Sequence, residues 1–122
     1  MKGLNKVLLL GNLGKDPEVQ TLEGNVKVAR FSLATTESYK GENGELKSHT
    51  EWHSIVLWRG LAELAEKYLT KGSSVHIEGK NRTRSYDDKQ GVKRFVTEVV
   101  AEQLILLDKK DDKKDDKNGD TL

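Results

Sequence analysis

The strongest constraint on the fold lies in residues 50–58, which have the sequence TEWHSIVLW. Side chains alternate between the two faces of a β-strand, so residues separated by an even number share a face. Trp52 and Trp58 therefore share one face, whereas Ile55 and Leu57 share the other. This pattern predicts a strand that packs one face against a core and carries both tryptophans on its other face. Because tryptophans on strands more often pack than bind ligands, a role for them depends on neighbouring segments.

Two segments before this strand show the same period of two. Residues 4–10 are expected to form a strand, followed by a loop at 11–17 and a turn at 23–25. Residues 26–36 form a second strand, which continues toward Tyr39 and ends at a polar hairpin tip at 41–45. We expect its core face to hold Ala29, Phe31, Leu33 and Thr35, and its half-exposed face Val28, Arg30, Ser32 and Ala34.

The period changes to that of an amphipathic helix after residue 60. The apolar residues at helical spacing are Leu61, Leu64, Ala65, Tyr68 and Leu69, and they place Tyr68 in the packed stripe. Gly72 is suited to the cap that ends this helix. Alternation returns at 74–86, and a turn at 87–91 leads to a last strand at 93–107. If no bulge intervenes, one face of the 74–86 strand holds Val75 and Ile77, and the other Lys80, Arg82, Arg84 and Tyr86.

The order of these segments favours a mainly all-β fold. Short strands with one helix do not suit a parallel βαβ array, but they suit a small closed barrel whose end is covered by the helix. We therefore expect a five-stranded OB-fold barrel at residues 1–107, with one capping helix between the third and fourth strands. Residues 108–122 hold five Lys and six Asp and little to bury, which predicts a disordered charged tail.

Composition excludes several classes of protein. No apolar run approaches the length of a membrane span, and the N-terminus shows no signal or transit peptide, so we expect no contact with a membrane. The chain has no cysteine, which excludes disulfides and thiolate sites and fits a cytosolic compartment. The net charge is only +1, so any binding of nucleic acid must depend on where the charges lie.

No arrangement of residues indicates catalysis, a metal or a cofactor. His49 and His53 share a strand face but lie about 13 Å apart, too far to bind one metal ion. His53 is expected to hydrogen-bond in the core or at a subunit contact. Gly14 and Lys15 follow a strand, but the spacing of a phosphate-binding loop is absent. We find no nucleophile elbow and no placed carboxylate pair, and we expect that the chain is not an enzyme.

Aromatic and basic residues converge on predicted exposed strand faces and at the start of a hairpin, where Tyr39 lies. The aromatic ones are Tyr39, Trp52, Trp58 and Tyr86, and Arg82 and Arg84 lie on the same strand face as Tyr86. Unpaired bases stack on flat side chains, with about 1–3 kcal/mol for each contact, and phosphates require cations nearby. Because stacking does not depend on the identity of the base, the combination favours a module that binds single-stranded nucleic acid with low sequence specificity.

The sequence resembles the bacterial single-stranded DNA-binding proteins over nearly all of residues 1–107. The matching motifs, in order, are NKV at 5–7, GNLG at 11–14, DPEV at 16–19, LAT at 33–35, TEWH at 50–53, YL at 68–69, KG at 71–72, VHIEG at 75–79, RTR at 82–84 and TEVV at 97–100.

The resemblance implies an OB-fold homotetramer that coats single-stranded DNA during replication, recombination and repair, located in the cytoplasm at the nucleoid. It implies base stacking on Tyr39, Trp52, Trp58 and Tyr86. It also implies phosphate contacts from Lys71, Arg82 and Arg84, with Lys2 and Arg59 as weaker candidates. Relatives often carry Trp at positions 39 and 86 and Phe at position 58, so this chain keeps an aromatic ring that can stack at each of these positions.

The tail differs from that of the family. Relatives end in a long linker and an acidic tip with Pro and Phe, which recruits replication and repair enzymes, whereas this chain ends in DTL after a short charge-balanced segment. A truncated form or an accessory paralogue would explain the difference. Two alternatives to binding single-stranded DNA are a primosome-type or RNA-binding OB protein and an OB scaffold that binds only proteins.

Overall fold

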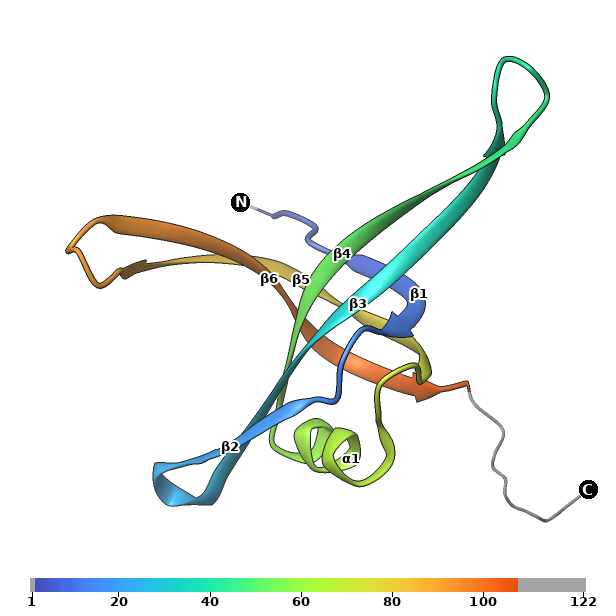
Figure 1. The fold of residues 1–122 in the computed structure, drawn as a ribbon. Helices are drawn as coiled ribbons and strands as arrows, with labels where there is room; N and C mark the ends of the chain where they lie inside the picture. The colour runs from blue at the N-terminus through green and yellow to red at the C-terminus, as the bar shows by residue number, and fades with distance from the viewer. Residues whose placement is uncertain (1, 108–122) are drawn as a thin grey trace, which may run out of the picture.

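The computed structural model describes residues 2–107, which form one sheet closed into a barrel, with a helix at one end (Figure 1). The strand order is β1-β5-β6-β4-β3-β2, and β1 also pairs with β3. The elements are β1 (Val7–Leu13), β2 (Glu18–Leu22), η1 (Glu23–Asn25), β3 (Val26–Lys40), β4 (Leu46–Trp58), α1 (Gly60–Tyr68), β5 (Ser74–Asp87) and β6 (Lys93–Leu106).

Two contacts close the barrel. The end of β1 leaves β5 and pairs with β3, where Leu13 lies opposite Leu33. On the other side β4 and β6 run parallel for a short distance, with Ile55 opposite Val99. The predicted fold class is confirmed, since β1, β3, β4, β5 and β6 form the barrel and α1 connects the third and fourth of them. The predicted tail at residues 108–122 lies outside the described residues.

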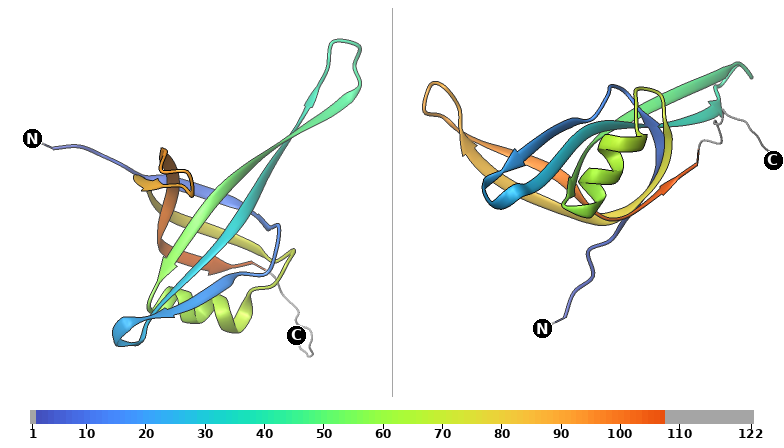
Figure 2. Two further views of the ribbon diagram at one scale, coloured as in Figure 1. Left: turned by 60° about the vertical axis from the view of Figure 1, so that its left-hand side comes forward. Right: turned by 90° about the horizontal axis from the view of Figure 1, so that it is seen from below.

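The alternation that predicted the strands also builds the core. On β3 and β4 the inward residues Leu33, Ile55 and Leu57 are fully buried, and on β5 so are Val75 and Ile77. Two alanines of α1, Ala62 and Ala65, are fully buried as well, because their small side chains let the helix approach the end of the barrel (Figure 2). No described helix is long and apolar enough to cross a membrane.

Some expectations from the sequence were wrong, and one strand was missed. Val28 is only 2% exposed because Trp58 lies opposite it on β4 and covers it. Tyr68 is 58% exposed, since the buried stripe of α1 is centred on Ala62 and Ala65 and not on the residue at the end of the helix. The short strand β2, which pairs with the start of β3, was not predicted.

Two hairpins extend well beyond the barrel (Figures 1 and 2). One is formed by β3 and β4, which pair without interruption from Val28 opposite Trp58 to Lys40 opposite Leu46. The other is formed by β5 and β6, whose turn is held by Asp88. Both hairpins continue strands of the barrel, so the residues along them keep a defined face.

Candidate nucleic-acid interface

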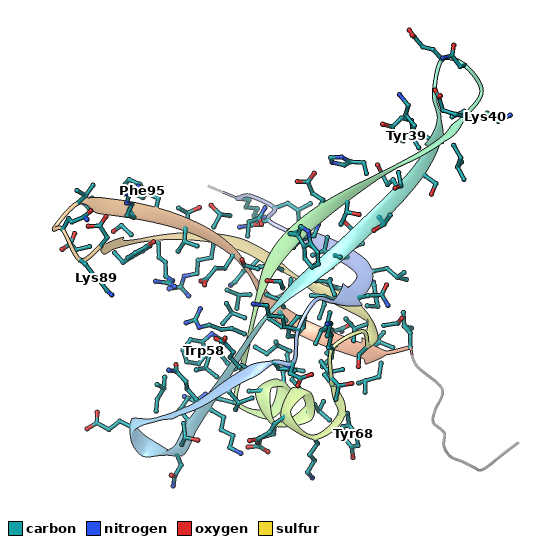
Figure 3. The ribbon with its side chains drawn as sticks, in the orientation of Figure 1. Tyr39, Lys40, Trp58, Tyr68, Lys89 and Phe95 are labelled. Carbon is teal, nitrogen blue, oxygen red and sulfur yellow. The ribbon has the colours of Figure 1, made fainter. Side chains whose placement is uncertain are left out.

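Both tryptophans lie outside the barrel. Trp52 is 59% exposed and Trp58 is 39% exposed, and both occupy the face of β4 that points away from Ile55 and Leu57. On the neighbouring strand β3 this outer face continues through Arg30 and Ser32. Figure 3 shows Trp58 at the side of the barrel, at the end of β4 that is far from the tip of the β3–β4 hairpin. The outer face of β3 and β4 therefore presents two flat rings to a ligand.

The ring of Trp52 rests on the loop after β1. A methyl group at Gly14 would lie only 2.6 Å from Cζ3 of Trp52, so glycine is what lets the indole lie against this backbone. The loop is fixed on both sides, since the Gly14 N–H donates to the Ser32 carbonyl (3.0 Å) and the Lys71 N–H donates to Oδ1 of Asp16 (2.7 Å). The position of Trp52 is thus set by backbone contacts.

An open cavity of about 540 Å³ lies beside Trp52. The loop after β1, the first residue of β2, residues of β3 and β4, and one residue of β6 form its walls. The lining residues are Gly14, Lys15, Asp16, Glu18, Arg30, Phe31, Ser32, Trp52, Ser54, Ile55 and Glu98. The lining combines one indole, two basic side chains and two hydroxyl groups with three carboxylates. The indole can accept a base, and the basic and hydroxyl groups can accept a phosphate.

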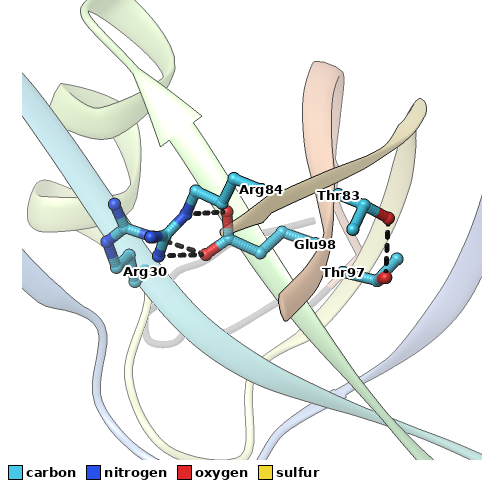
Figure 4. Close-up of polar contacts among 5 residues, drawn as sticks. All are labelled: Arg30, Thr83, Arg84, Thr97 and Glu98. Carbon is cyan, nitrogen blue, oxygen red and sulfur yellow. Dashed lines mark hydrogen bonds and ion pairs between the residues drawn. The ribbon is translucent and has the colours of Figure 1, made fainter. Parts of the chain in front are cut away.

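Glu98 of β6 joins two arginines from different strands (Figure 4). Its Oε2 lies 2.6 Å from Nη1 of Arg30 on β3, and its Oε1 lies 3.1 Å from Nε of Arg84 on β5. The Glu98 side chain is only 10% exposed, whereas both arginine side chains are about half exposed. The two guanidinium groups are therefore held at the surface by one carboxylate beneath them.

The charges of this group are mutually stabilised. Burial raises the pKa of Glu98, but the hydrogen bond from Arg84 and the charge of Arg30 outweigh burial and lower it overall. The hydrogen bond to Glu98 and its negative charge raise the pKa of Arg84. One carboxylate charge is therefore placed against two guanidinium groups, which leaves a formal net charge of +1.

Strand β5 presents Arg82, Arg84 and Tyr86 on one face. The pairing of β5 with β6 shifts between Glu78 and Gly79, because Glu78 lies opposite Gln103 whereas Gly79 lies opposite Ala101. The extra residue is on β6, so the alternation of β5 continues. Through Glu98 this face is continuous with Arg30 on β3, and Tyr86 is half exposed further along the hairpin.

Tyr39 belongs to a different face of its hairpin. It is half exposed on β3, five residues after Ala34, which lies opposite Trp52 in an unbroken register. An odd separation places its ring on the other side of the ribbon from Trp52. His53 lies on that side also, where its Nε2 is 2.9 Å from Oγ1 of Thr35 in a partly buried hydrogen bond.

The remaining predicted phosphate contacts lie around the edge of this surface. Lys71 is exposed in the loop after α1 and is linked through Asp16 to the loop under Trp52. Arg59 follows Trp58 directly and is exposed at the start of α1, with a positive φ of 57°. Lys2 is exposed in the segment before β1, which Asn5 fixes to Asn81 of β5. Lys71 is thus tied to the loop under Trp52, Arg59 follows Trp58 in the chain, and Lys2 lies in the segment that Asn5 ties to β5.

Sequence reasoning missed two residues of the site. Arg30 was placed on the half-exposed face of its strand, but no partner on another strand was assigned to it. Glu98 was quoted only as part of the TEVV motif at 97–100. A signal for both was the alternation of polar residues along otherwise apolar strands. Their contact depends on the order β5-β6-β4-β3, which the sequence pattern does not give.

A five-stranded OB-type barrel that carries exposed aromatic rings and paired arginines on one outer face defines a class of nucleic-acid-binding module. Comparison with known proteins narrows this class. Residues 4–107 match the single-strand binding protein family. The chain belongs to this family. Its members are non-enzymatic DNA-binding proteins, in agreement with the prediction from the sequence that the chain is not an enzyme.

Two relatives illustrate the match. The chain is 47% identical to "Single-stranded DNA-binding protein 1" of Chlorobaculum tepidum over 111 residues, which cover 90% of this chain and 68% of the relative. It is also similar to the protein in a solved structure described as the Plasmodium falciparum SSB complex with ssDNA. That match has a TM-score of 0.80 and 39% identity, and it covers 88% of this chain and 98% of the other.

Proposed function

We propose that the chain binds single-stranded DNA without sequence specificity, and that it coats and protects unpaired DNA during replication, recombination and repair. The observation that carries this proposal is the outer face on which Trp52 and Trp58 lie beside Arg30 and Arg84. Family membership and the similarity to an SSB in complex with ssDNA support it.

Each aromatic or basic side chain has a distinct role in the proposal. Tyr39, Trp52, Trp58 and Tyr86 stack on bases, since each ring is at least one-third exposed and can lie flat against a base. Arg82, Arg84 and Lys71 pair with phosphates, and Lys2 and Arg59 extend the basic surface. Because Tyr39 lies on the other side of its hairpin, a bound strand reaches it only by passing over the edge of the ribbon.

We further propose that the protein is a homotetramer in the cytoplasm. An apolar surface supports self-association, since Leu8 and Leu10 of β1 and Ile105 of β6 are about half exposed or more on the two strands that flank β5. Apolar residues grouped in this way favour a contact with a second copy.

A fluorescence titration with oligo-dT tests the proposed function, on a sample whose mass is measured by light scattering. Stacking on Trp52 and Trp58 is expected to quench the tryptophan fluorescence as oligo-dT is added. A titration with structured RNA at the same salt concentration separates the DNA-binding function from an RNA-binding one. The absence of quenching and of binding would favour an OB scaffold that contacts only proteins.

A further inference from the structure

We propose that Glu98 is an internal counter-ion that occupies the guanidinium groups of Arg30 and Arg84 and thereby weakens the binding of DNA phosphates at this site. The inference rests on the proposed function, and it identifies a residue that sets the affinity for single-stranded DNA. Glu98 is one of the residues that line the cavity beside Trp52, which the proposed function assigns to a bound nucleotide.

The geometry places the carboxylate in the position of a phosphate. Arg84 uses both Nε and Nη2 toward Glu98, at 3.1 Å from Oε1 and 3.3 Å from Oε2. This edge of a guanidinium is the one that binds carboxylates and phosphates in a bidentate manner. Arg30 adds a shorter contact, 2.6 Å from its Nη1 to Oε2. A DNA phosphate must therefore displace these bonds or use the remaining N–H groups.

Burial distinguishes Glu98 from an ordinary surface partner. Its side chain is 10% exposed, while those of Arg30 and Arg84 are 40% and 46% exposed. The carboxylate is fixed below the surface, so it stays beside both arginines when DNA binds. The three residues present one positive charge to the strand instead of two, which reduces both the attraction to phosphates and the number of counterions released.

Substitution of the carboxylate by an amide tests this inference directly. Glu98→Gln preserves the shape of the side chain and removes its charge, so oligo-dT should bind roughly tenfold more tightly at low salt. The slope of log K against log salt should become steeper by about 0.7, the value for one more neutralised phosphate of a single strand. A brace that only holds the strands together would give weaker or unchanged binding, and either result would overturn the proposal.

A matched control is available on the helix. Glu66 of α1 pairs with Lys27 at 2.5 Å and is half exposed, so Glu66→Gln changes the net charge by the same amount away from the cavity. The slope of log K against log salt for Glu66→Gln should equal that of the unmodified protein. If the unmodified protein does not bind oligo-dT, the proposed function itself fails. If it binds and Glu98→Gln does not bind more tightly, only the inference about Glu98 fails.

A second comparison leaves Glu98 in place, and therefore remains available if the first variant does not fold. Arg82 and Arg84 share a face of β5, and among residues 2–107 Arg82 belongs to none of the ion pairs found. Since Glu98 already neutralises part of the charge of Arg84, Arg82→Gln should reduce the affinity for oligo-dT more than Arg84→Gln does. The opposite order would contradict the inference.

Discussion

Gly14 shows how one absent side chain sets the place of an aromatic ring. We expect Gly14→Ala to move the indole of Trp52, because the added methyl would lie 2.6 Å from Cζ3 and 2.9 Å from Cη2. The ring is exposed and can move without disturbing the core, so the barrel should remain folded while binding of oligo-dT weakens. The quenching of tryptophan fluorescence at saturation should also decrease.

Gly60 provides the control for this change. A methyl group there would meet nothing within 4 Å, so Gly60→Ala adds the same group without a contact. The two variants should differ in oligo-dT affinity while both keep the far-ultraviolet circular dichroism of the unmodified protein. Equal affinities would mean that the position of Trp52 does not matter for binding.

Substitution of the two tryptophans should affect DNA binding alike but the stability of the fold differently. Trp52→Ala and Trp58→Ala are each expected to weaken oligo-dT binding by about 1–3 kcal/mol, the range for the loss of one stacked base. Trp58→Ala should in addition lower the free energy of unfolding by about 1 kcal/mol, because the indole covers Val28, which is 2% exposed. Titration and urea unfolding measure the two effects separately.

Tyr68 supplies a control for these variants. It is an exposed aromatic residue on α1, away from the cavity, so Tyr68→Ala should leave oligo-dT binding unchanged. Affinities for Trp52→Ala and Trp58→Ala that match that of Tyr68→Ala would remove both tryptophans from the interface.

At this scale the sequence predicted single residues better than their contacts. The alternation over 50–58 placed Trp52 and Trp58 opposite the buried Ile55 and Leu57. It did not find the contact between Glu98 and Arg30, which are 68 residues apart. Such a contact depends on which strands are neighbours, and the pattern within one strand carries no information on this point.

Among the elements, the hairpin of β5 and β6 depends on the side chain of Asp88. Its Oδ1 accepts hydrogen bonds from the Gln90 and Val92 N–H groups, both at 2.9 Å, and its Oδ2 accepts one from Nε of Arg94. Asp88→Ala should therefore loosen the turn that supports Tyr86. Faster amide hydrogen exchange at Gln90 and Val92 is the expected observation.

The pH dependence of this turn follows from the same bonds. The hydrogen bond from Arg94, and then that from Val92, lower the pKa of Asp88 below its ordinary value of 3.8. A lowered pKa in the folded state means that the contribution is complete above the ordinary pKa and is lost as the pH falls through the lowered one. The protection of the Gln90 amide, measured against its intrinsic exchange rate at each pH, should thus fall only in acid. Arg94→Gln should have a smaller effect than Asp88→Ala because it keeps the two backbone bonds.

Elements with a regular period were predicted and one without it was not. The helix at Gly60–Tyr68 and the long strands lie close to their expected positions, because each buries a stripe or a face. Strand β2 (Glu18–Leu22) is short and almost entirely exposed, so hydrophobic alternation does not mark it. It forms because β3 is longer than the barrel and offers it a free edge near Val26.

At the scale of the whole molecule, the barrel presents two outer surfaces of different chemistry. One lies on β3, β4 and β5 and carries the rings and arginines of the proposed DNA interface. The other lies on β1 and β6 and carries exposed leucine and isoleucine side chains. The sequence alone did not locate the second surface, because an exposed leucine on a strand looks the same in a sequence as a buried one.

The apolar surface leads to a prediction about assembly. Leu10 is 66% exposed in the single chain, so Leu10→Lys should fold with nearly unchanged stability as a monomer. In a homotetramer that buries this surface, the same change would place an unpaired charge in an interface, and the mass from light scattering should fall.

Leu46→Lys is the matched control, since Leu46 is 77% exposed at the hairpin tip, away from this surface, and the mass should then stay unchanged. Tryptophan quenching by a short oligo-dT should persist in Leu10→Lys, because Trp52 and Trp58 lie on other strands. A Leu10→Lys protein with the mass of the unmodified one would exclude this surface as the contact between copies.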